Sequence, residues 1–150
     1  MKIVRENLKV SSRELYYSLK KEYKHCLIIV KEKLCYKTFD EDAKIMWYIF
    51  HYKYSDNVVI FGNKAFDKVV NKLKSLNIRF VIVSKIEELL SYGNDDLGYL
   101  SYYDLSQKAY CYVQKEKQLI SRMKTLLANH PECYNDICTF FDNMEKNIIE

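Results

Sequence analysis

Short apolar runs that alternate with helical patterns constrain the fold of this chain most strongly. Three such runs occupy residues 26–30, 57–61 and 78–83, and Val and Ile dominate them, which is typical of buried strands. The segments between them carry apolar residues every three or four positions, as helices do. With only 3 Gly and 1 Pro, the chain also lacks the turn residues of an all-β protein. The sequence therefore predicts an α/β fold.

The helix before the first run has a recognisable start. Two serines, Ser11 and Ser12, precede Glu14 and form a capping box, in which a serine hydroxyl accepts from a first-turn amide while Glu14 reaches back to the cap. The apolar stripe of this predicted helix consists of Leu15, Tyr16, Leu19 and Tyr23.

A strand and a helix are expected directly after the first run. Residues 31–33 can turn the chain back into a second strand over 34–38. Asp40 is a suitable N-cap for a helix over 41–51. The inward side chains of that helix are Ala43, Met46, Trp47 and Phe50.

The run 57–61 opens a strand–helix–strand unit. Asn63 can cap a helix over 64–76, and Asn77 suits the left-handed position that ends a helix. The apolar side of this helix consists of Phe66, Val69, Val70 and Leu73. Such βαβ units join parallel strands by a right-handed crossover. We therefore expect the strands 57–61 and 78–83 to pair in parallel.

Beyond residue 83 the pattern becomes mainly helical. A short helix is expected over 85–91, a loop over 92–98, and a long helix from Asp104 or Ser106 to about residue 128. Its apolar side consists of Ala109, Val113, Ile120, Met123 and Leu127, and that of the last helix of Cys133, Ile137, Phe140, Phe141, Met144 and Ile148. The sequence thus predicts an α/β domain over residues 1–90 and an αα-hairpin over 99–150, packed on the same domain or on a partner.

The charge is unevenly distributed although the net charge is only +4. Residues 1–40 carry ten Lys or Arg against five Asp or Glu, residues 105–124 carry five against one, and residues 129–150 carry one against five. Basic segments of this kind favour an anionic partner. The alternative is a solvated surface that keeps the protein soluble.

The chain has the features of a cytoplasmic protein. The N-terminus lacks the apolar run of a signal peptide, and no run approaches the ~18 residues that span a bilayer. Its five cysteines are an odd number and are expected to be reduced: Cys26, Cys35, Cys111, Cys133 and Cys138.

Residues 22–84 resemble a known family. Residues 23–30 followed by 39–44 resemble the opening domain of the MutS proteins, in which a strand leads through a Gly-Asp turn into Phe-Tyr-Glu-Leu-Phe-Tyr-Asp-Asp-Ala and a helix. Residues 60–62, the next helix and residues 79–83 are similar to later segments of that mismatch-recognition domain. The resemblance implies a mixed sheet flanked by helices.

The departures from the family concern its mismatch reader. There a Phe-x-Glu motif wedges an aromatic ring against the mispaired base, but the matching positions are Cys35 and Lys37. A thiol lacks the stacking area of Phe, and Lys37 can contact a phosphate but cannot accept a proton from a base. The Gly-Asp turn is replaced by Glu32-Lys33, and the chain contains no Walker-type Gly-rich loop. We therefore expect neither mismatch reading nor ATPase activity.

The resemblance implies a non-catalytic accessory role. Small MutS-like proteins accompany the reverse transcriptases of diversity-generating retroelements, so a reverse transcriptase, its template RNA, or both are the expected partners. The alternative is a protein-interaction module without nucleic-acid binding. DNA versus RNA and the oligomeric state stay open. The expected phosphate contacts are Lys31, Lys33 and Lys37, together with a row on the long helix formed by Lys108, Lys115, Lys117, Arg122 and Lys124.

Other sites are not favoured by the sequence. His130, Cys133 and Cys138 suggest zinc, but two cysteines five residues apart on a helix point ~140° apart, and a fourth ligand is lacking. We expect no metal, no cofactor and no catalytic site. The tyrosines near the long helix can stack bases or pack a helix–sheet seam with wet hydroxyls, and packing is favoured: Tyr99, Tyr102, Tyr103, Tyr110 and Tyr112.

Overall fold

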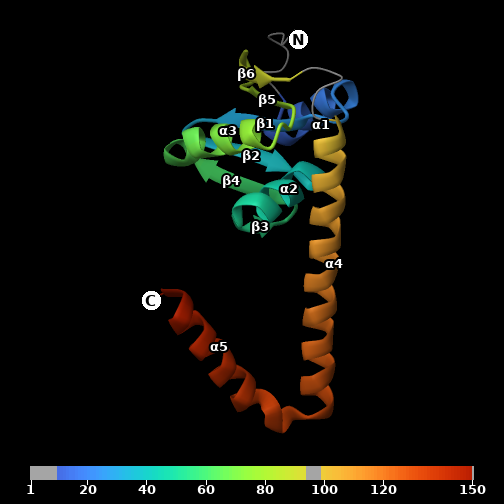
Figure 1. The fold of residues 1–150 in the computed structure, drawn as a ribbon, viewed down its shortest axis with the longest axis vertical. Helices are drawn as coiled ribbons and strands as arrows, with labels where there is room; N and C mark the ends of the chain where they lie inside the picture. The colour runs from blue at the N-terminus through green and yellow to red at the C-terminus, as the bar shows by residue number, and fades with distance from the viewer. Residues whose placement is uncertain (1–9, 94–98, 150) are drawn as a thin grey trace. The chain divides into compact units, whose positions relative to one another are not determined.

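The computed structural model describes residues 10–93 and 99–149. It divides into two compact units, Met1–Tyr112 and Val113–Glu150, here called the α/β unit and the terminal helix unit. Figure 1 shows the elements, which are α1 (Ser12–Glu22), β1 (Leu27–Glu32), β2 (Cys35–Phe39), α2 (Asp40–Phe50), β3 (Tyr54–Ser55), β4 (Val58–Gly62), the 3₁₀ turn η2 (Asn63–Ala65), α3 (Phe66–Ser75), β5 (Phe80–Val83), β6 (Glu88–Tyr92), α4 (Tyr99–Asn129), the 3₁₀ turn η3 (Pro131–Cys133) and α5 (Tyr134–Ile149).

A mixed six-stranded sheet in the order β3-β4-β2-β1-β5-β6 forms the centre of the α/β unit. β1 pairs antiparallel with β2 and parallel with β5. Its first four residues, 27–30, are fully buried because both faces of the central strand are covered. The predicted α/β class with a mixed sheet and flanking helices is confirmed.

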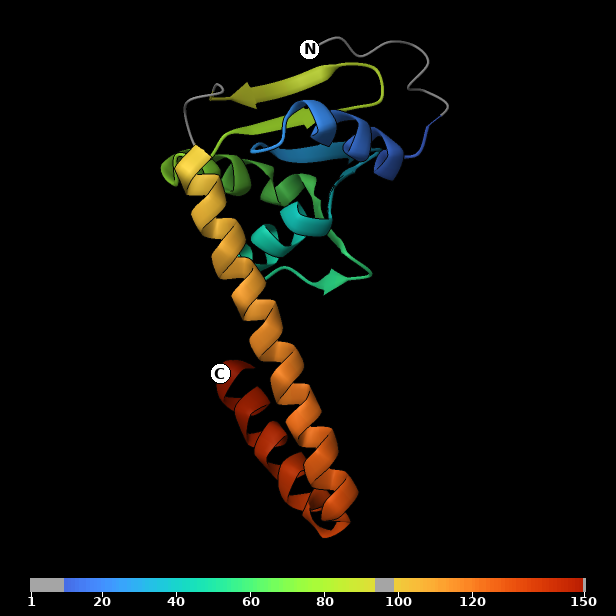
Figure 2. The ribbon, with the colours of Figure 1, turned by 90° about the vertical axis from the view of Figure 1, so that its right-hand side faces the viewer.

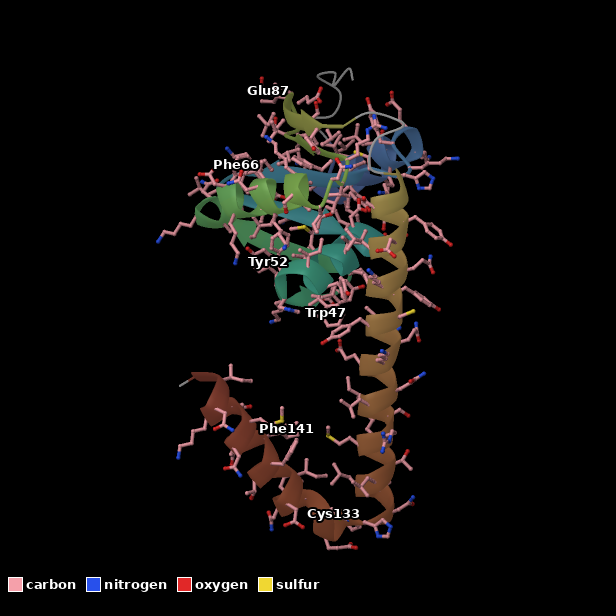
Figure 3. The ribbon with its side chains drawn as sticks, viewed as in Figure 1. Trp47, Tyr52, Phe66, Glu87, Cys133 and Phe141 are labelled. Atoms are coloured by element: carbon pink, nitrogen blue, oxygen red, sulfur yellow. The ribbon has the colours of Figure 1, made fainter. Side chains whose placement is uncertain are left out.

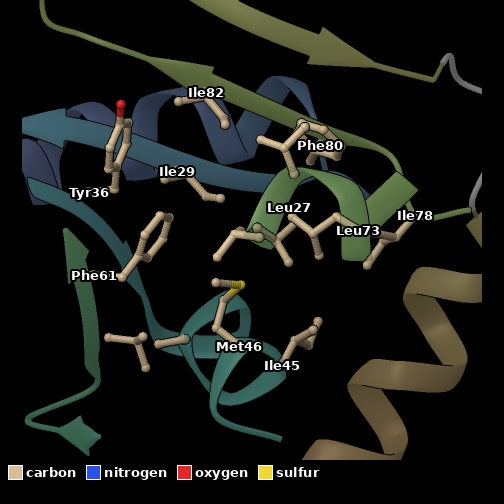
Figure 4. Close-up of a cluster of buried hydrophobic side chains, with 14 of the residues drawn as sticks. Leu27, Ile29, Tyr36, Ile45, Met46, Phe61, Leu73, Ile78, Phe80 and Ile82 are labelled. Carbon is tan, nitrogen blue, oxygen red and sulfur yellow. The ribbon is translucent and has the colours of Figure 1, made fainter. Parts of the chain in front are cut away.

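Each face of the sheet carries its own hydrophobic cluster. The larger cluster joins Leu27 and Ile29 of β1 to Met46 of α2 and Leu73 of α3 (Figure 4). The smaller one joins Ile28 and Val30 to α1 on the opposite face. In Figure 2, α1 is the blue helix beside the sheet. This division follows from the pleat, since successive side chains of a strand point to opposite faces. Each buried Leu or Ile stabilises the fold by roughly 1.5–3 kcal/mol.

The predicted helix signals are confirmed at two positions. Ser11 is the N-cap of α1: its hydroxyl accepts from the Glu14 amide at 3.1 Å, and the Ser11 amide donates to the Glu14 carboxylate at 3.4 Å. Asn77 follows α3 with a left-handed φ of 56°. The cap predictions for Asp40 and Asn63 are wrong, because Asp40 is the first residue of α2 and Asn63 begins the 3₁₀ turn η2.

The helix predicted over 85–91 is wrong. This segment contains β6, which pairs antiparallel with β5 through Phe80↔Tyr92 and Ile82↔Leu90. The edge of β5 would otherwise present unpaired backbone groups, so tertiary pairing outweighs the local pattern. The two-residue strand β3 has no periodicity that could predict it.

The parallel pairing predicted for the strands on either side of α3 is also wrong. β4 and β5 run in the same direction, but β2 and β1 lie between them. β5 pairs instead with β1, from Leu27↔Phe80 to Val30↔Val83. The connection through α3 therefore crosses two strands. The prediction had assumed that β5 pairs with the strand that precedes it in the sequence.

The long helix α4 begins at Tyr99, earlier than the predicted Asp104 or Ser106. Its first part belongs to the α/β unit, where Tyr102 and Ala109 are buried in the larger cluster. The division between the compact units falls after Tyr112, inside this helix. Both helices predicted for the C-terminal region are present.

Candidate nucleic-acid interface

The β1–β2 hairpin carries the three lysines that the sequence favours for phosphate contact. The strands end at Glu32 and restart at Cys35, and Lys33 occupies the turn with a left-handed φ of 59°. Lys33 is exposed, and its neighbour Leu34 is 77% exposed. The turn is therefore accessible to a large partner.

Lys31 and Lys37 lie on opposite faces of the sheet. Lys31 pairs with Tyr36, and its ammonium lies 5.8 Å from the centre of the Tyr36 ring, on the face covered by α3. Lys37 pairs with Val30, on the face covered by α1. The hairpin therefore does not gather its three lysines into one patch.

The charge of Lys37 is already paired within the fold. Its ammonium lies 3.1 Å from the Glu32 carboxylate, which also accepts a hydrogen bond of 2.6 Å from the Ser12 hydroxyl. The Ser12 hydrogen bond, with help from Lys37, lowers the pKa of Glu32. Of the three hairpin lysines, Lys37 is thus the least suited to bind a phosphate.

Cys35 and Lys37 occupy the positions matching the family's mismatch reader, and both are engaged locally. Cys35 is half-buried, and its thiol donates to the Glu32 carbonyl at 3.2 Å. Because alternate residues of a strand share a face, Cys35 and Lys37 lie on the same side of β2. Neither side chain presents a flat surface on which a base can stack.

The turn η2 and helix α3 add exposed lysines that sequence reasoning did not include. Lys64 of η2 and Lys68 and Lys72 of α3 are spaced four residues apart and are all exposed. The inner side of α3 packs on the sheet, where Phe66 contacts Tyr36 with ring centres 5.1 Å apart. The spacing of four was the signal that could have found them.

The register of the sheet places the turn η2 beside the hairpin turn. Cys35 pairs with Gly62, so Lys33 and Lys64 each lie two residues from this pair. Lys31 is on the α3 side of the same strand pair. We call Lys31, Lys33 and Lys64 the lysine rim. Burial raises the pKa of Tyr36, and the negative charge of the nearby Asp67 raises it further.

The cations of α4 do not form the single row that was expected. Lys108 is in the α/β unit and pairs with Asp104 at 2.8 Å, which raises the pKa of Lys108. Residues seven apart share a helix face, so Lys115 lies in line with Arg122 and Lys117 with Lys124. The two lines are separated by about 160° around the helix. All four are exposed, but one flat surface cannot contact both lines.

The tyrosines at the start of α4 divide between packing and exposure. Tyr102 is buried, and Tyr112 packs on Trp47 with ring centres 4.9 Å apart while the residue stays 45% exposed. Tyr103 and Tyr110 are each 53% exposed. The expected packing role is therefore seen for the rings of Tyr102 and Tyr112. The Tyr102 hydroxyl was expected to be exposed to water, but it is hydrogen-bonded to Asp42 inside the protein.

A buried polar network around Asp42 is the main feature that the sequence did not reveal. The Asp42 carboxylate has no exposed surface and accepts hydrogen bonds from Tyr16 at 2.9 Å, from Tyr102 at 2.6 Å and from the Ile28 amide at 3.1 Å. The ammonium of Lys20 lies 2.9 Å from the same carboxylate. The network joins α1, β1, α2 and α4 at one point.

Every polar side chain of the Asp42 network has a partner. Lys20 also donates to the Cys26 carbonyl at 2.6 Å and to the Tyr102 hydroxyl at 2.8 Å. Burial, followed by the charge of Asp42, raises the pKa of both Tyr16 and Tyr102, which therefore stay protonated as donors. A fully paired carboxylate with no exposed surface has no access to a substrate, so the network holds the elements together and is not suited to acid–base chemistry.

A small open hollow of about 410 Å³ lies beside the network. Its lining includes Lys20, Lys24, Glu41 and Ser106, and the last two are hydrogen-bonded to each other. Among residues 10–93 and 99–149, no buried side-chain nitrogen or oxygen lacks a partner. The described lining of the hollow therefore contains no buried polar side-chain atom that lacks a partner.

The residues considered for zinc do not assemble a site. His130 lies 3.2 Å from Glu132, and Cys133 and Cys138 are half-buried. Within the described part of the chain, no three His, Cys, Asp or Glu side chains are placed to hold a metal ion. In the same residues, no helix has the length and apolarity needed to cross a membrane.

We expect Cys26 to resist alkylation in the folded protein. Burial raises its pKa to about 12, so its thiolate fraction at pH 8 is about a thousandfold below that of an ordinary thiol. Iodoacetamide labelling followed by mass spectrometry should modify the exposed Cys111 and leave Cys26 unmodified until denaturant is added. Equal labelling of both thiols under native conditions would contradict the buried position of Cys26.

Comparisons with known proteins returned no relative. A scan against protein-family models found no match, and a search of curated proteins found none either.

Proposed function

We propose that this protein is a non-catalytic, nucleic-acid-associated accessory protein that contacts phosphates and does not read mismatches. The observation that carries the proposal is the lysine rim, whose three exposed or half-exposed lysines lie within a few residues of the accessible hairpin turn along the paired strands. The resemblance of residues 22–84 to the MutS recognition domain supports the same surface. It also suggests a reverse transcriptase as the enzyme that is assisted.

The absence of mismatch reading follows from the chemistry at Cys35 and Lys37. A Phe that stacks on a base contributes about 1–3 kcal/mol, and a half-buried thiol cannot replace that contact. Lys37 is held by Glu32 at 3.1 Å. Phosphate contacts alone add affinity without sequence information.

The test is equilibrium binding of the full chain to labelled single-stranded RNA, paired duplex DNA and mismatched duplex DNA at two salt concentrations. Affinity should fall steeply with salt, by about 0.7–0.9 in log K per unit of log salt for each phosphate contacted. The paired and mismatched duplexes should bind equally. Absence of binding at low salt would refute direct nucleic-acid association.

Reversing the lysine rim should remove most of this binding. Lys31→Glu, Lys33→Glu and Lys64→Glu together eliminate up to three phosphate contacts, so the salt slope should fall by about 2–3. A control of equal charge, Lys21→Glu, Lys53→Glu and Lys74→Glu, changes exposed lysines outside the rim. Equal loss in both variants would indicate a general charge effect and would contradict a defined interface. Lys37 is left unchanged because its reversal would repel Glu32.

A second candidate function is a protein-interaction module without nucleic-acid binding. It is favoured by the apolar side chains exposed on the terminal helix unit, among them Leu119 at 60% and Phe140 at 61%. Salt-insensitive binding to a protein partner, with no binding to any of the three nucleic acids, would support this alternative.

A further inference from the structure

The terminal helix unit leaves most of its apolar surface uncovered. None of residues 114–148 is buried, although both helices carry an apolar stripe. The exposed members are Leu119, Ile120, Leu126, Phe140, Phe141, Met144 and Ile148. Helix α5 has 16 residues, little more than the ~12–15 below which an isolated helix is marginal in water, and most helices in proteins are stabilised by packing of their apolar face. A partner that covers this apolar stripe would therefore stabilise α5.

The two helices of this unit do not cover each other. A groove of about 720 Å³ separates them, lined by Leu119, Met123 and Leu126 from α4 and by Ile137 and Phe141 from α5. Figure 3 shows Phe141 on the side of α5 that is turned toward α4. The lining is apolar along the two facing stripes and polar beside them, which suits an amphipathic helix.

The charges beside the stripes indicate which helix fits. The α4 segment 113–129 carries four cations and one anion, whereas α5 carries three anions and one cation. By helical geometry, Lys115 and Lys124 flank the α4 stripe on its two sides, and Asp136 and Glu145 flank the α5 stripe. A basic apolar helix and an acidic apolar helix are complementary, as at the edges of coiled coils.

We propose that the terminal helix unit is a self-association surface, on which the basic α4 segment of one chain packs against the acidic α5 of a second copy. A two-fold arrangement makes this contact twice, because α5 of the first chain then meets α4 of the second. The four helices enclose both apolar stripes. Neither contact requires a residue of the lysine rim, so the association is independent of the proposed nucleic-acid binding.

Sedimentation velocity of the full chain over a wide concentration range tests the association. The expected species has twice the chain mass of 18.0 kDa. Leu126→Glu with Phe140→Glu should give the monomer, because these exposed side chains lie in the proposed contact. Gln118→Glu with Thr139→Glu adds the same charge on the polar sides of the two helices and should leave the dimer intact. None of the four side chains is buried, so the substitutions should not unfold the α/β unit.

A charge exchange distinguishes pairing between chains from pairing within one chain. Lys115→Glu with Lys124→Glu gives one variant, and Asp136→Lys with Glu145→Lys gives the other. Each alone should dimerise more weakly, by tenfold or more in Kd. An equimolar mixture should recover the dimer, since both of its contacts again join opposite charges. A monomeric wild-type chain at every concentration, or a mixture that shows no recovery, would overturn the proposal.

Discussion

Replacing Asp42 with alanine is expected to lower the free energy of unfolding by about 3–5 kcal/mol, because it leaves buried hydrogen-bond donors without their acceptor and a half-buried ammonium without its counter-ion. Lys20 would lose a partner at 2.9 Å, and the hydroxyls of Tyr16 and Tyr102 would lose their acceptor. Such a loss is a large part of the 5–15 kcal/mol that typically stabilises a domain. Urea unfolding followed by far-UV circular dichroism measures the change.

Asp67→Ala is the matched control for this experiment. Asp67 is exposed in the first turn of α3, where a carboxylate contributes about 0.3–1 kcal/mol through the helix dipole. The two variants should therefore differ severalfold in their effect on stability. Similar unfolding midpoints for Asp42→Ala and Asp67→Ala would show that the Asp42 network does not stabilise the protein in solution.

Alkaline pH should destabilise the protein steeply above pH 10. Burial and the nearby Asp42 charge raise the pKa of Tyr16 and Tyr102 in the folded state, while an unfolded tyrosine titrates near pH 10. Above that pH the unfolded chain loses protons that the folded chain keeps, so stability falls as pH rises. Each tyrosine contributes a slope of about 1.4 kcal/mol per pH unit, or about 2.7 for the pair. Below pH 10 this contribution to stability is fully present.

The origin of the alkaline effect can be assigned with phenylalanine variants. Tyr16→Phe with Tyr102→Phe should flatten the decline of the unfolding free energy with pH, at the cost of lower stability at neutral pH from the lost hydrogen bonds. Tyr103→Phe with Tyr110→Phe replaces two half-exposed tyrosines and should leave the slope unchanged. Smaller contributions in the same direction come from further tyrosines with a raised pKa, among them Tyr23, Tyr36 and Tyr54. An unchanged slope in the first variant would contradict the assignment.

Local signals in the sequence predicted the elements well but not their pairing. The capping box at Ser11 and Glu14, the left-handed Asn77 and the fully buried run of β1 all depend on neighbouring residues and were predictable. The partner of β5 and the strand β6 depend on contacts between distant segments. Periodicity carries no information on which strand edge stays open, so both predictions were wrong.

The candidate site was predictable only in its charge. The sequence shows where the lysines stand in the chain. The face of the sheet on which Lys31 and Lys37 each lie follows only from the register of the hairpin. Asp42 could have been suspected, because it stands beside Ala43 on the inward side of an amphipathic helix. Its partners could not, since Tyr16 and Tyr102 come from helices 26 and 60 residues away in the chain.

The Asp42 network also bears on the order of folding. Its contacts from Tyr102 to Lys20 and to Asp42 close loops of 82 and 60 residues, and long closures slow the search for the native state. A nascent chain that has not yet produced residue 102 lacks one of the donors to the Asp42 carboxylate. Docking of the first turns of α4 is thus expected to be a late step in folding.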